Sequence, residues 1–551
     1  MRYRITGLAL EPAIVEDGRR LADVLARVLS VDVPEIRQAV VVRHSLDARR
    51  RPARHIYSIE VDVPDAVTPR PRPPRGSAVR LVDSETSPAA LRADGVFVGR
   101  TAIHRFAEGF RPVVIGAGPG GLFAALALAR LGAPPVVLER GGRVEDRGEV
   151  VERFWDDGDL DPESNVLFGE GGAGAFSDGK IYTRTRSPQI SSVLKELVEL
   201  GAPKRILVDA RPHIGAETLH AIIRAFRDRL EKLGVSFRFG ACVTGLIRDE
   251  ASVVGVRLGD EELRRAPVIL APGHSARDTY RFLRDADVEM EAWSSSIGLR
   301  VEHPQGLIDR VQYKAPSPRR PELPPADYHL AHHDRGGGRG AYTFCMCPGG
   351  RIIAATAQRG RVVTNGMADT RRSGDRANSG IVVQVRPDDY APFGAGDDPL
   401  AGLAFHDHFE RLAFEAGGGD YRAPAQRVVD FLAARPSSDP IDATYRPGVT
   451  PGDLRECLPD SVSATIARAL VGFGRRLSGF DGPDAVLVGV ETRASSPVRL
   501  LRDDEGRSLG LKGLYPVGEG AGYAGGIVSA AVDGIRSAER LVEHHKVRVA
   551  T

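Results

Sequence analysis

Residues 111–140 read RPVVIGAGPGGLFAALALARLGAPPVVLER. An apolar run at 113–115 leads into a G-x-G-x-x-G motif at 116–121. An alanine-rich stretch, a glycine turn and a second apolar run follow, and Glu139 closes the second run. This order is the strand–helix–strand unit of a dinucleotide-binding Rossmann fold. The stretch therefore predicts an α/β domain that binds a dinucleotide.

The three motif glycines have separate physical roles. Gly116 permits the tight turn, Gly118 lets a pyrophosphate approach the backbone, and Gly121 permits close packing of helix on strand. The start of the helix offers unpaired N–H groups and a positive dipole end to phosphates. Glu139 stands where an acid bonds the adenosine ribose hydroxyls. The predicted cofactor ligands of this unit are Gly116, Ala117, Gly118, Pro119, Gly120, Gly121, Glu139 and Arg140.

The alternative is a glycine turn inside an α/β layer that binds nothing. A lone G-x-G-x-x-G motif would leave that alternative open, because glycine turns are common. Here the strand, the helix, the second strand and the terminal acid are all in place. The complete unit favours a dinucleotide site.

Composition places the chain among ordinary globular proteins. Its 551 residues are 42% hydrophobic and 27% charged, with a formal net charge of +2 at pH 7. The length predicts about three or four units, and the charge balance argues against DNA as a partner and makes RNA a weaker expectation. Four scattered cysteines do not form a secreted disulfide framework. Because no signal peptide and no run of about 18 apolar residues is present, we expect a cytoplasmic protein without a membrane span.

Two further regions favour FAD over NAD. Residues 235–258 read as a β-meander, and a following apolar strand closes on an Ala-Pro-Gly turn at 271–273. Near the C-terminus a strand ends at 518–520, and a helix rich in small residues opens after 525. This order resembles the two-dinucleotide-binding-domain flavoproteins, in which these segments pass beside FAD. A positive helix end stabilises the anionic N1–C2=O edge of a reduced flavin.

The same resemblance implies roles for individual residues. An acid at the position of Glu519 bonds the ribityl chain in the resembled flavoproteins. The residues that this adds to the predicted FAD ligands are Val243, Ala271, Gly273, Gly518, Glu519, Gly526 and Ile527.

A glycine-rich loop at 166–180, VLFGEGGAGAFSDGK, carries two acids and one of the seven lysines. In the resembled flavoproteins a loop at this distance from the ribose acid passes the pyrophosphate and the N5 edge of the flavin. A cation there favours the reduced anion. The alternative is a rigid turn with Asp178 and Lys180 paired at the surface. The further cofactor candidates are Arg147, Gly172, Ser177, Asp178 and Lys180.

Long stretches of the chain resemble a bacterial family of FAD-dependent dehydrogenases whose substrates are unassigned. The resemblance implies FAD and an oxidoreductase activity without supplying a reaction. The segments that carry it are SLDARR at 45–50, FGEGGAGAFSDGK at 168–180, GLRVEHPQ at 298–305, FCMCPGG at 344–350, TNGM at 364–367, VETRASSPVRL at 490–500 and GEGAGYAGGIVSA at 518–530.

Changes in residue composition and in strand and helix patterns along the chain predict the domain organisation. Residues 1–98 alternate strand and helix patterns and end in a Pro/Arg-rich linker, which predicts a small α+β domain. Residues 99–290 and 481–551 share the glycine-rich α/β style, so we expect them to form one Rossmann-like FAD-binding domain. Residues 291–480 are expected to be an inserted α+β substrate or cap domain. The predicted fold class is α/β with these three parts.

The catalytic candidates are Lys180, His303 and Tyr523, without a basis for choosing among them. Arg493 and Arg499 are candidates for binding a carboxylate or phosphate on a substrate. We expect hydride transfer between the flavin and a small organic substrate.

Other sequence features leave alternatives open. Cys345 and Cys347 are expected on one buried face of a strand rather than in a redox disulfide. No pair of ligand motifs predicts a metal site. NAD(P)H remains a possible transient reductant that would dock without its own Rossmann domain, and the oligomeric state stays open. The basic tip at 43–54 keeps a flavin-dependent RNA-modifying enzyme as an alternative, and a flavoprotein electron carrier is another.

Overall fold

A parallel sheet of five strands organises the region of the G-x-G-x-x-G motif. Its strand order is β23–β11–β5–β6–β7, and every neighbouring pair is parallel. The strands are β5 (Val113–Ile115), β6 (Val136–Leu138), β7 (Ser236–Arg238), β11 (Val268–Leu270) and β23 (Leu514–Pro516). All residues of β5, β6, β11 and β23 are buried, as in parallel sheets covered on both faces. The C-terminal region thus completes the sheet that the motif begins.

The chain divides into two compact units. The smaller comprises Met1–Phe97 and Lys180–Ile214, and the larger comprises Val98–Gly179 and Gly215–Thr551. The computed structural model describes residues 1–48, 53–82, 104–183, 185–265, 267–314, 323–333 and 338–547. Within these ranges no helix is both long and apolar enough to cross a membrane.

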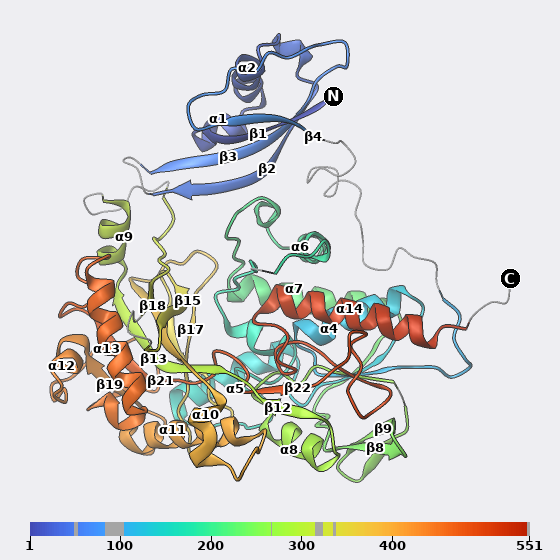
Figure 1. Cartoon of the computed structure of the whole chain (residues 1–551), viewed down its shortest axis with the longest axis vertical. Helices are drawn as coiled ribbons and strands as arrows, with labels where there is room; N and C mark the ends of the chain where they lie inside the picture. Colours follow the sequence, from blue (N-terminus) through green and yellow to red (C-terminus); the bar gives the residue numbers. More distant parts are fainter. Residues whose placement is uncertain are drawn as a thin grey trace. The chain divides into compact units, whose positions relative to one another are not determined.

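Two helices of the larger unit pack tightly against each other. Helix α4 (Pro119–Arg130) follows β5, and α14 (Ile527–His545) follows β23 (Figure 1). A Cβ atom on Gly534 would lie 2.1 Å from the carbonyl oxygen of Gly120. Only glycine allows these two backbones to approach so closely. On its other side α4 contacts α7 (Ala216–Lys232).

A seven-stranded sheet forms the core of the region between the two halves of the Rossmann-like domain. Its order is β14–β15–β18–β13–β21–β19–β20, and only the β19–β20 pair is parallel. The strands are β13 (Ser295–Pro304), β14 (Ala331–His332), β15 (Ala341–Cys347), β18 (Arg376–Val385), β19 (Ala423–Arg427), β20 (Val449–Pro451) and β21 (Val486–Glu491). Because β21 lies between β13 and β19, this sheet continues past the boundary expected at residue 480. The α+β insert within a Rossmann-like domain confirms the predicted fold class.

Helices and short strand pairs complete the larger unit. The helices of the insert are α9 (Gln305–Tyr313), α10 (Pro387–Tyr390), α11 (Ala401–Gly417), α12 (Val428–Leu432) and α13 (Asp460–Gly474). Outside the insert lie α5 (Val144–Asp157) and α8 (Arg277–Asp285). The small sheets are β8 (Gly245–Asp249) with β9 (Ser252–Leu258) and β10 (Glu261–Leu263), β12 (Met290–Ala292) with β22 (Val498–Leu500), and β16 (Arg351–Ala354) with β17 (Thr364–Met367).

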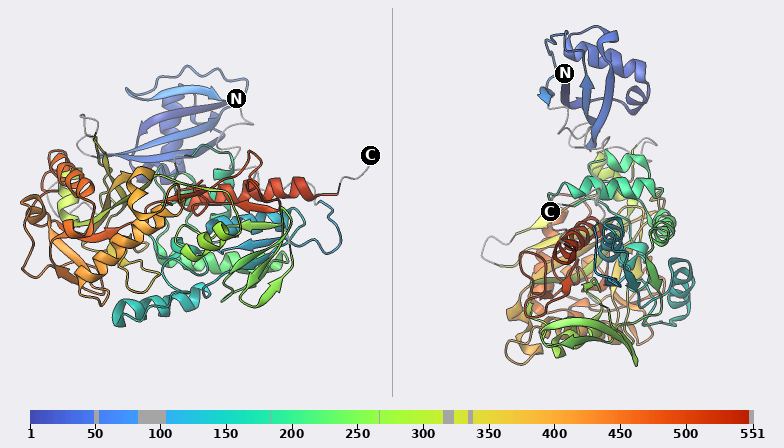
Figure 2. Two further views of the ribbon diagram at one scale, coloured as in Figure 1. Left: turned by 60° about the horizontal axis from the view of Figure 1, so that its bottom comes forward. Right: turned by 90° about the vertical axis from the view of Figure 1, so that its right-hand side faces the viewer.

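The smaller unit contains an antiparallel sheet in the order β2–β3–β1–β4. Its strands are β1 (Arg2–Ala9), β2 (Gln38–Asp47), β3 (Arg54–Asp62) and β4 (Ala78–Val82), and its first helices are α1 (Pro12–Glu16) and α2 (Gly18–Leu29). Helix α2 covers one face of the sheet (Figure 2). Leu21 and Leu25 of this helix pack in one core with Ile5 and Ile59 of the sheet. Residues 49–52 of the basic tip lie outside the described residues.

Residues 180–214 leave the larger unit and join the N-terminal sheet at β2. The N–H group of His44 donates to the carbonyl of Val208 (2.8 Å), and the N–H of Ala210 donates to the carbonyl of His44 (2.8 Å). The Nδ1 atom of His44 lies 3.0 Å from Oδ1 of Asp209. Helix α6 (Gln189–Glu199) belongs to the same excursion. The sequence patterns did not predict this second segment of the smaller unit.

Strand β15 departs from the regular geometry expected of it. Cys345 has a φ of +47°, and the pairing with β18 shifts register between Phe344 and Cys347. The expectation that Cys345 and Cys347 share one strand face is therefore wrong, because a bulge breaks the two-residue alternation. Neither cysteine forms a disulfide, and the thiol of Cys347 lies 3.3 Å from the carbonyl oxygen of Cys345.

His303, a catalytic candidate, ends up in the core of the insert. Its Nε2 donates to the carbonyl of Phe480 (2.8 Å), and the two rings lie 4.4 Å apart. Its Nδ1 is buried and has no hydrogen-bond partner among the described residues. Burial lowers the pKa of His303 to about 4, because the imidazolium would lose its hydration.

Replacing Gly534 with alanine should destabilise the protein. The added methyl group would collide with the Gly120 carbonyl, so we expect the free energy of unfolding to fall by about 1–3 kcal/mol. The matched control is Gly148→Ala in α5, since a Cβ there meets no atom within 4 Å. The control should keep or gain about 0.5–1 kcal/mol. Thermal and denaturant unfolding measure both; equal behaviour of the two variants would contradict this account of the α4–α14 contact.

The buried histidine should make stability depend on pH. The unfolded chain takes up a proton near the ordinary His pKa, whereas folded His303 resists it until about pH 4. Stability contributed by neutral His303 is therefore present above about pH 6.5 and falls as the pH drops toward 4. We expect unfolding of the wild type between pH 6 and 4.5 to take up about one proton more than unfolding of His303→Gln. The free energy of unfolding should therefore change less steeply with pH in the variant, by ~1.4 kcal/mol per pH unit, as denaturant unfolding at several pH values can measure. An unchanged slope would mean that His303 titrates normally.

Candidate cofactor site

Three loops meet at the carboxyl ends of β5, β11 and β23. A Cβ on Gly116 would lie 2.2 Å from the carbonyl oxygen of Ala271, and one on Gly520 would lie 2.6 Å from that of Gly273. The turns after these strands are therefore in backbone contact. Ligands of open α/β sheets bind outside the carboxyl ends of the strands. The structure thus brings together three regions that the sequence predicted as cofactor-binding.

Gly118 differs from its neighbours in what surrounds it. A Cβ on Gly121 would lie 1.9 Å from the carbonyl oxygen of Gly116, so protein packing alone requires glycine there. Beyond its chain neighbours, a Cβ on Gly118 would meet only the Cα of Gly172, at 3.9 Å, among the described residues, and φ is −77°. Packing within the described part of the protein therefore does not require glycine at this position. A phosphate against the start of α4 would require it, so these residues fit a dinucleotide.

The start of α14 lies close to the same loop. A Cβ on Gly174 would be 3.4 Å from Cδ1 of Ile527 and 3.9 Å from Cγ of Pro119. The short helix η2 (Gly172–Phe176) therefore lies between the N-terminal ends of α4 and α14. Both helices direct a positive dipole end and unpaired N–H groups to this region. Such an arrangement suits an anionic or electron-rich ligand.

Glu139 is a buried acceptor for three separate backbone segments. Its Oε2 accepts from the N–H of Ala117 (2.8 Å), and its Oε1 accepts from those of Gly141 (3.0 Å) and Gly169 (2.9 Å). Only 5% of the residue is exposed. Within the described chain Oε2 accepts one hydrogen bond, which leaves it a lone pair for a hydroxyl group. The carboxylate therefore shapes the site and retains capacity for the predicted ribose contact.

Arg147 is the corresponding buried donor. Its guanidinium donates to the carbonyl oxygens of Asn165 (2.7 Å), Val166 (3.1 Å), Glu170 (2.5 Å) and Gly172 (3.1 Å). Burial lowers the pKa of Arg147 to about 10, and the side chain remains charged at neutral pH. These contacts fix the path of the 165–172 loop. A direct contact of Arg147 with the cofactor stays a prediction.

Other predicted ligands take structural partners. Arg140 forms ion pairs with Glu163 (2.9 Å) and Asp278 (2.9 Å). The Ser177 hydroxyl donates to the carbonyl of Gly174 (2.8 Å). Asp178 is buried and pairs with Arg372 of the insert (2.5 Å), so a surface pair with a lysine is not its role. Val243 lies in the core beside the parallel sheet. The roles of these residues toward a cofactor stay predictions.

Glu519 lies on the turn after β23 and near the insert. Its Oε2 is 3.8 Å from Nδ1 of His274, which follows the Ala-Pro-Gly turn. Burial, and then the thiol of Cys345, raise the pKa of the Glu519 carboxyl to about 7. Nε2 of His274 in turn donates to the carbonyl oxygen of Arg493 (3.1 Å), which follows β21 of the insert. The insert therefore contributes to the surroundings of the candidate site.

The three catalytic candidates lie in different places. Lys180 begins the excursion of the smaller unit, where it forms a backbone bridge with His213. His303 lies in the core of the insert, as described above. Tyr523 lies on the turn that Gly518 begins, with its ring 3.7 Å from the guanidinium carbon of Arg502. Of these candidates, only Tyr523 lies on a loop at the carboxyl edge of the sheet.

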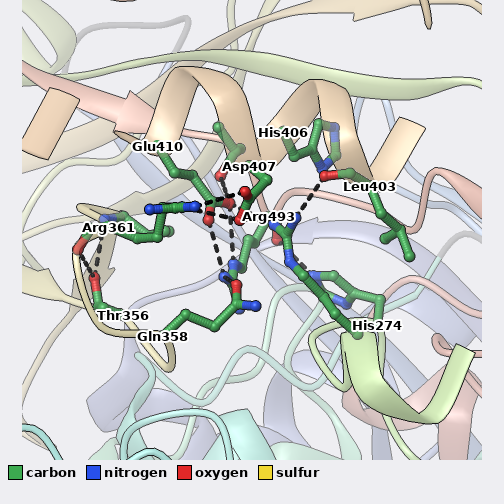
Figure 3. A network of polar contacts seen from close by, with 12 residues as sticks. His274, Thr356, Gln358, Arg361, Leu403, His406, Asp407, Glu410 and Arg493 are labelled. Carbon is green, nitrogen blue, oxygen red and sulfur yellow. Dashed lines mark hydrogen bonds and ion pairs between the residues drawn. The ribbon is translucent and has the colours of Figure 1, made fainter. Parts of the chain in front are cut away.

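A buried polar network next to His274 was not predicted. Its centre is Glu410 on α11, an acid that no sequence motif distinguishes from the others of the chain. Its members are Arg277, Gln358, Arg361, Asp407, Glu410 and Arg493 (Figure 3). In the described part of the chain, no group of three or more His, Cys, Asp or Glu side chains is placed to hold a metal ion.

Two sequence profiles match the chain. Residues 294–494 match a family described as "FAD-dependent protein, C-terminal domain-like", and residues 2–62 match a domain of unknown function. The first match covers the insert and extends through β21. An uncharacterised protein from Clostridium beijerinckii is 39% identical over 546 residues, which cover 98% of this chain and 99% of that protein.

Solved flavoprotein structures show only distant similarity. The 3-ketosteroid-delta4-(5alpha)-dehydrogenase from Rhodococcus jostii is 14% identical, with a TM-score of 0.33 over 82% of this chain and 100% of that chain. The glycerol-3-phosphate dehydrogenase from Bacillus halodurans, complexed with FAD, is 12% identical, with a TM-score of 0.34 over 80% of this chain and 65% of that chain. Similarity at this level carries no information on substrate.

Full-length identity to the Clostridium protein and the profile match lead to one assignment. The chain belongs to the family of FAD-dependent proteins that share this C-terminal domain, and its substrate is unassigned.

Proposed function

We propose that this protein is an oxidoreductase that binds FAD at the carboxyl edge of its parallel sheet and transfers a hydride between flavin and a small organic substrate. The observation that carries the proposal is the open position at Gly118, at the start of α4 and opposite Gly172. Protein packing does not explain this glycine, whereas a bound pyrophosphate does. The family assignment supplies FAD as the dinucleotide.

Each end of the cofactor has a fitting set of residues. Backbone N–H groups at the start of α4 would bind the pyrophosphate, and Glu139 would accept from a ribose hydroxyl. Glu519 would accept from the ribityl chain, and the start of α14 would orient the flavin by its positive dipole end. When bound, FAD supplies the acceptor or donor of the hydride. The protein contributes binding, orientation and the electrostatic field.

The substrate would bind on the side of the insert. His274 lies 3.8 Å from Glu519 and donates to the carbonyl oxygen of Arg493 directly after β21, so the insert reaches the turn that we assign to the flavin. The seven-stranded sheet of the insert would provide a rigid support for substrate contacts. NAD(P)H as a transient reductant, and the catalytic roles of Tyr523 and Lys180, remain part of the proposal. No contact among the described residues favours RNA modification or an electron-carrier role over this function.

Gly118→Ala tests the cofactor site directly. The alanine fits the protein without a ligand, so we expect normal folding, but its methyl group would occupy the space of the pyrophosphate. The purified wild type should be yellow with flavin absorbance, and FAD titration by fluorescence quenching should show at least about tenfold weaker binding for the variant, or ~1.4 kcal/mol.

Gly148→Ala, which adds the same methyl group on α5, is the control and should bind FAD like the wild type. Wild-type protein that takes up no FAD would refute the proposed function. Gly118→Ala with unchanged affinity would instead place the cofactor elsewhere.

Arg147→Lys tests the positioning of the 165–172 loop. Lysine keeps the charge but cannot span four carbonyl groups, so buried acceptors would lose their partners at a cost of about 1–3 kcal/mol each. We expect a lower melting temperature and faster proteolysis within the loop, and FAD should restore part of the loss by mass action. Arg143→Lys, at an exposed residue one turn earlier, is the control. A variant as stable as the wild type would show that the loop holds its path without Arg147.

A further inference from the structure

Glu410 is the centre of a buried charge network in the larger unit. Its Oε1 accepts from Nη2 of Arg277 (2.8 Å), and its Oε2 accepts from Nη2 of Arg493 (3.0 Å). The hydroxyl of Thr492 also donates to Oε1 (2.7 Å). The Glu410 side chain is fully buried, and those of Arg277 and Arg493 are only 3% and 4% exposed. Figure 3 shows Glu410 and Arg493 pointing toward each other from α11 and the segment after β21.

The network holds more positive than negative charge. Two guanidinium groups share the single carboxylate of Glu410, while Arg361 and Asp407 pair with each other (2.7 Å). Burial alone would raise the pKa of Glu410, but the charges of Arg277 and Arg493 outweigh it and lower the pKa to about 2. Burial lowers the pKa values of the adjacent His274 and His406 to about 4 and 3, so both are neutral. Three cations therefore face two anions.

Two of the network's buried donors are unused within the described part of the chain. Nη1 of Arg493 and Nε of Arg277 make no hydrogen bond with any described residue. A buried N–H group without a partner is unfavourable, and on a charged side chain more so. The same guanidinium of Arg493 is otherwise fixed, because its Nη2 donates to Gln358 (3.1 Å) as well as to Glu410. An anion with an acceptor oxygen would satisfy the free donor and the surplus charge together.

The backbone of Arg493 lies close to the proposed flavin region. The carbonyl oxygen of Arg493 accepts a hydrogen bond from Nε2 of His274 (3.1 Å). His274 directly follows the turn whose Gly273 touches Gly520, and its other nitrogen is 3.8 Å from Glu519. His274 thus connects Arg493 to the loops that we assign to the cofactor. This position suits a group that orients a substrate at the flavin.

We infer that Arg493 binds the carboxylate of the substrate, which makes the substrate class an organic acid. The inference rests on the proposed function for the role of the site, and on Arg493, Arg277 and Glu410 for the chemistry. Nη1 of Arg493 is a charged donor without an acceptor among the described residues, and a carboxylate would match both its charge and its hydrogen bonds, whereas a neutral amide brings no charge. Glu410 holds the guanidinium in place and neutralises one of the two arginines, so one positive charge remains for the ligand.

Carboxylate probes test the inference on the FAD-loaded full chain. Acetate, benzoate and succinate are titrated against acetamide and benzamide, with the flavin visible spectrum and thermal unfolding as readouts. At least one carboxylate should shift both signals at about millimolar concentration, and its amide should not. Arg493→Gln should weaken the response at least about tenfold, and Arg493→Lys should weaken it less. Because Glu410 keeps Arg277 as a partner, Arg493→Gln leaves no unpaired carboxylate.

Arg411→Gln is the matched comparison, since Arg411 follows Glu410 on α11 but is 41% exposed and pairs with Glu415 at the surface (2.6 Å). Its response to carboxylates should stay within about twofold of the wild type. A wild type indifferent to every carboxylate, equal responses to acids and amides, or an unchanged Arg493→Gln would each overturn the inference. Flavin content is measured separately, so failure to bind FAD would count against the proposed function alone. Thermal unfolding still reports carboxylate binding when flavin is absent.

Discussion

The site depends on two buried side chains of opposite charge, Glu139 and Arg147, which bind main-chain groups and do not pair with each other. The Glu139 carboxylate accepts from N–H groups of three segments, and the Arg147 guanidinium donates to four carbonyl groups of the 165–172 loop. A buried charge is tolerated only when its hydrogen-bonding capacity is used. Here each charge finds its partners in main-chain groups that would otherwise be unsatisfied. The two side chains therefore fix one conformation for loops whose glycines would otherwise allow many.

That path decides what the rest of the larger unit can bind. It places Gly172 opposite Gly118 and brings Gly174 close to the start of α14. Two helix starts consequently share one region, although residues 131–526 separate α4 from α14. Close packing at Gly534 holds the two helices together, since a Cβ there would lie 2.1 Å from the carbonyl oxygen of Gly120. The loop, the helices and the two charges form one connected structure.

Local sequence predicts the parts of this fold whose causes are local. The glycines at 116, 118 and 121, the strand–helix–strand order and Glu139 lie within thirty residues, so their geometry follows from their spacing. The edge pairing of His44 with residues 208–210 depends on a partner far along the chain, and no periodicity reveals it. The same holds for Asp178, whose partner Arg372 belongs to the insert. At Cys345 a bulge overrode the alternation from which the strand faces were predicted.

The buried charges around Glu410 differ from Glu139 and Arg147 in how their hydrogen bonds are satisfied. Both oxygens of Glu139 and the guanidinium of Arg147 hold backbone groups of the protein, whereas Arg277 and Arg493 leave donors unused around Glu410. Replacing such a network by apolar residues would often cost nothing in stability, so its persistence needs another cause. A ligand that arrives with its own negative charge supplies that cause, because it completes the hydrogen bonds only when bound. Differential stabilisation of this kind orients a substrate, and it connects the insert to the chemistry at the flavin.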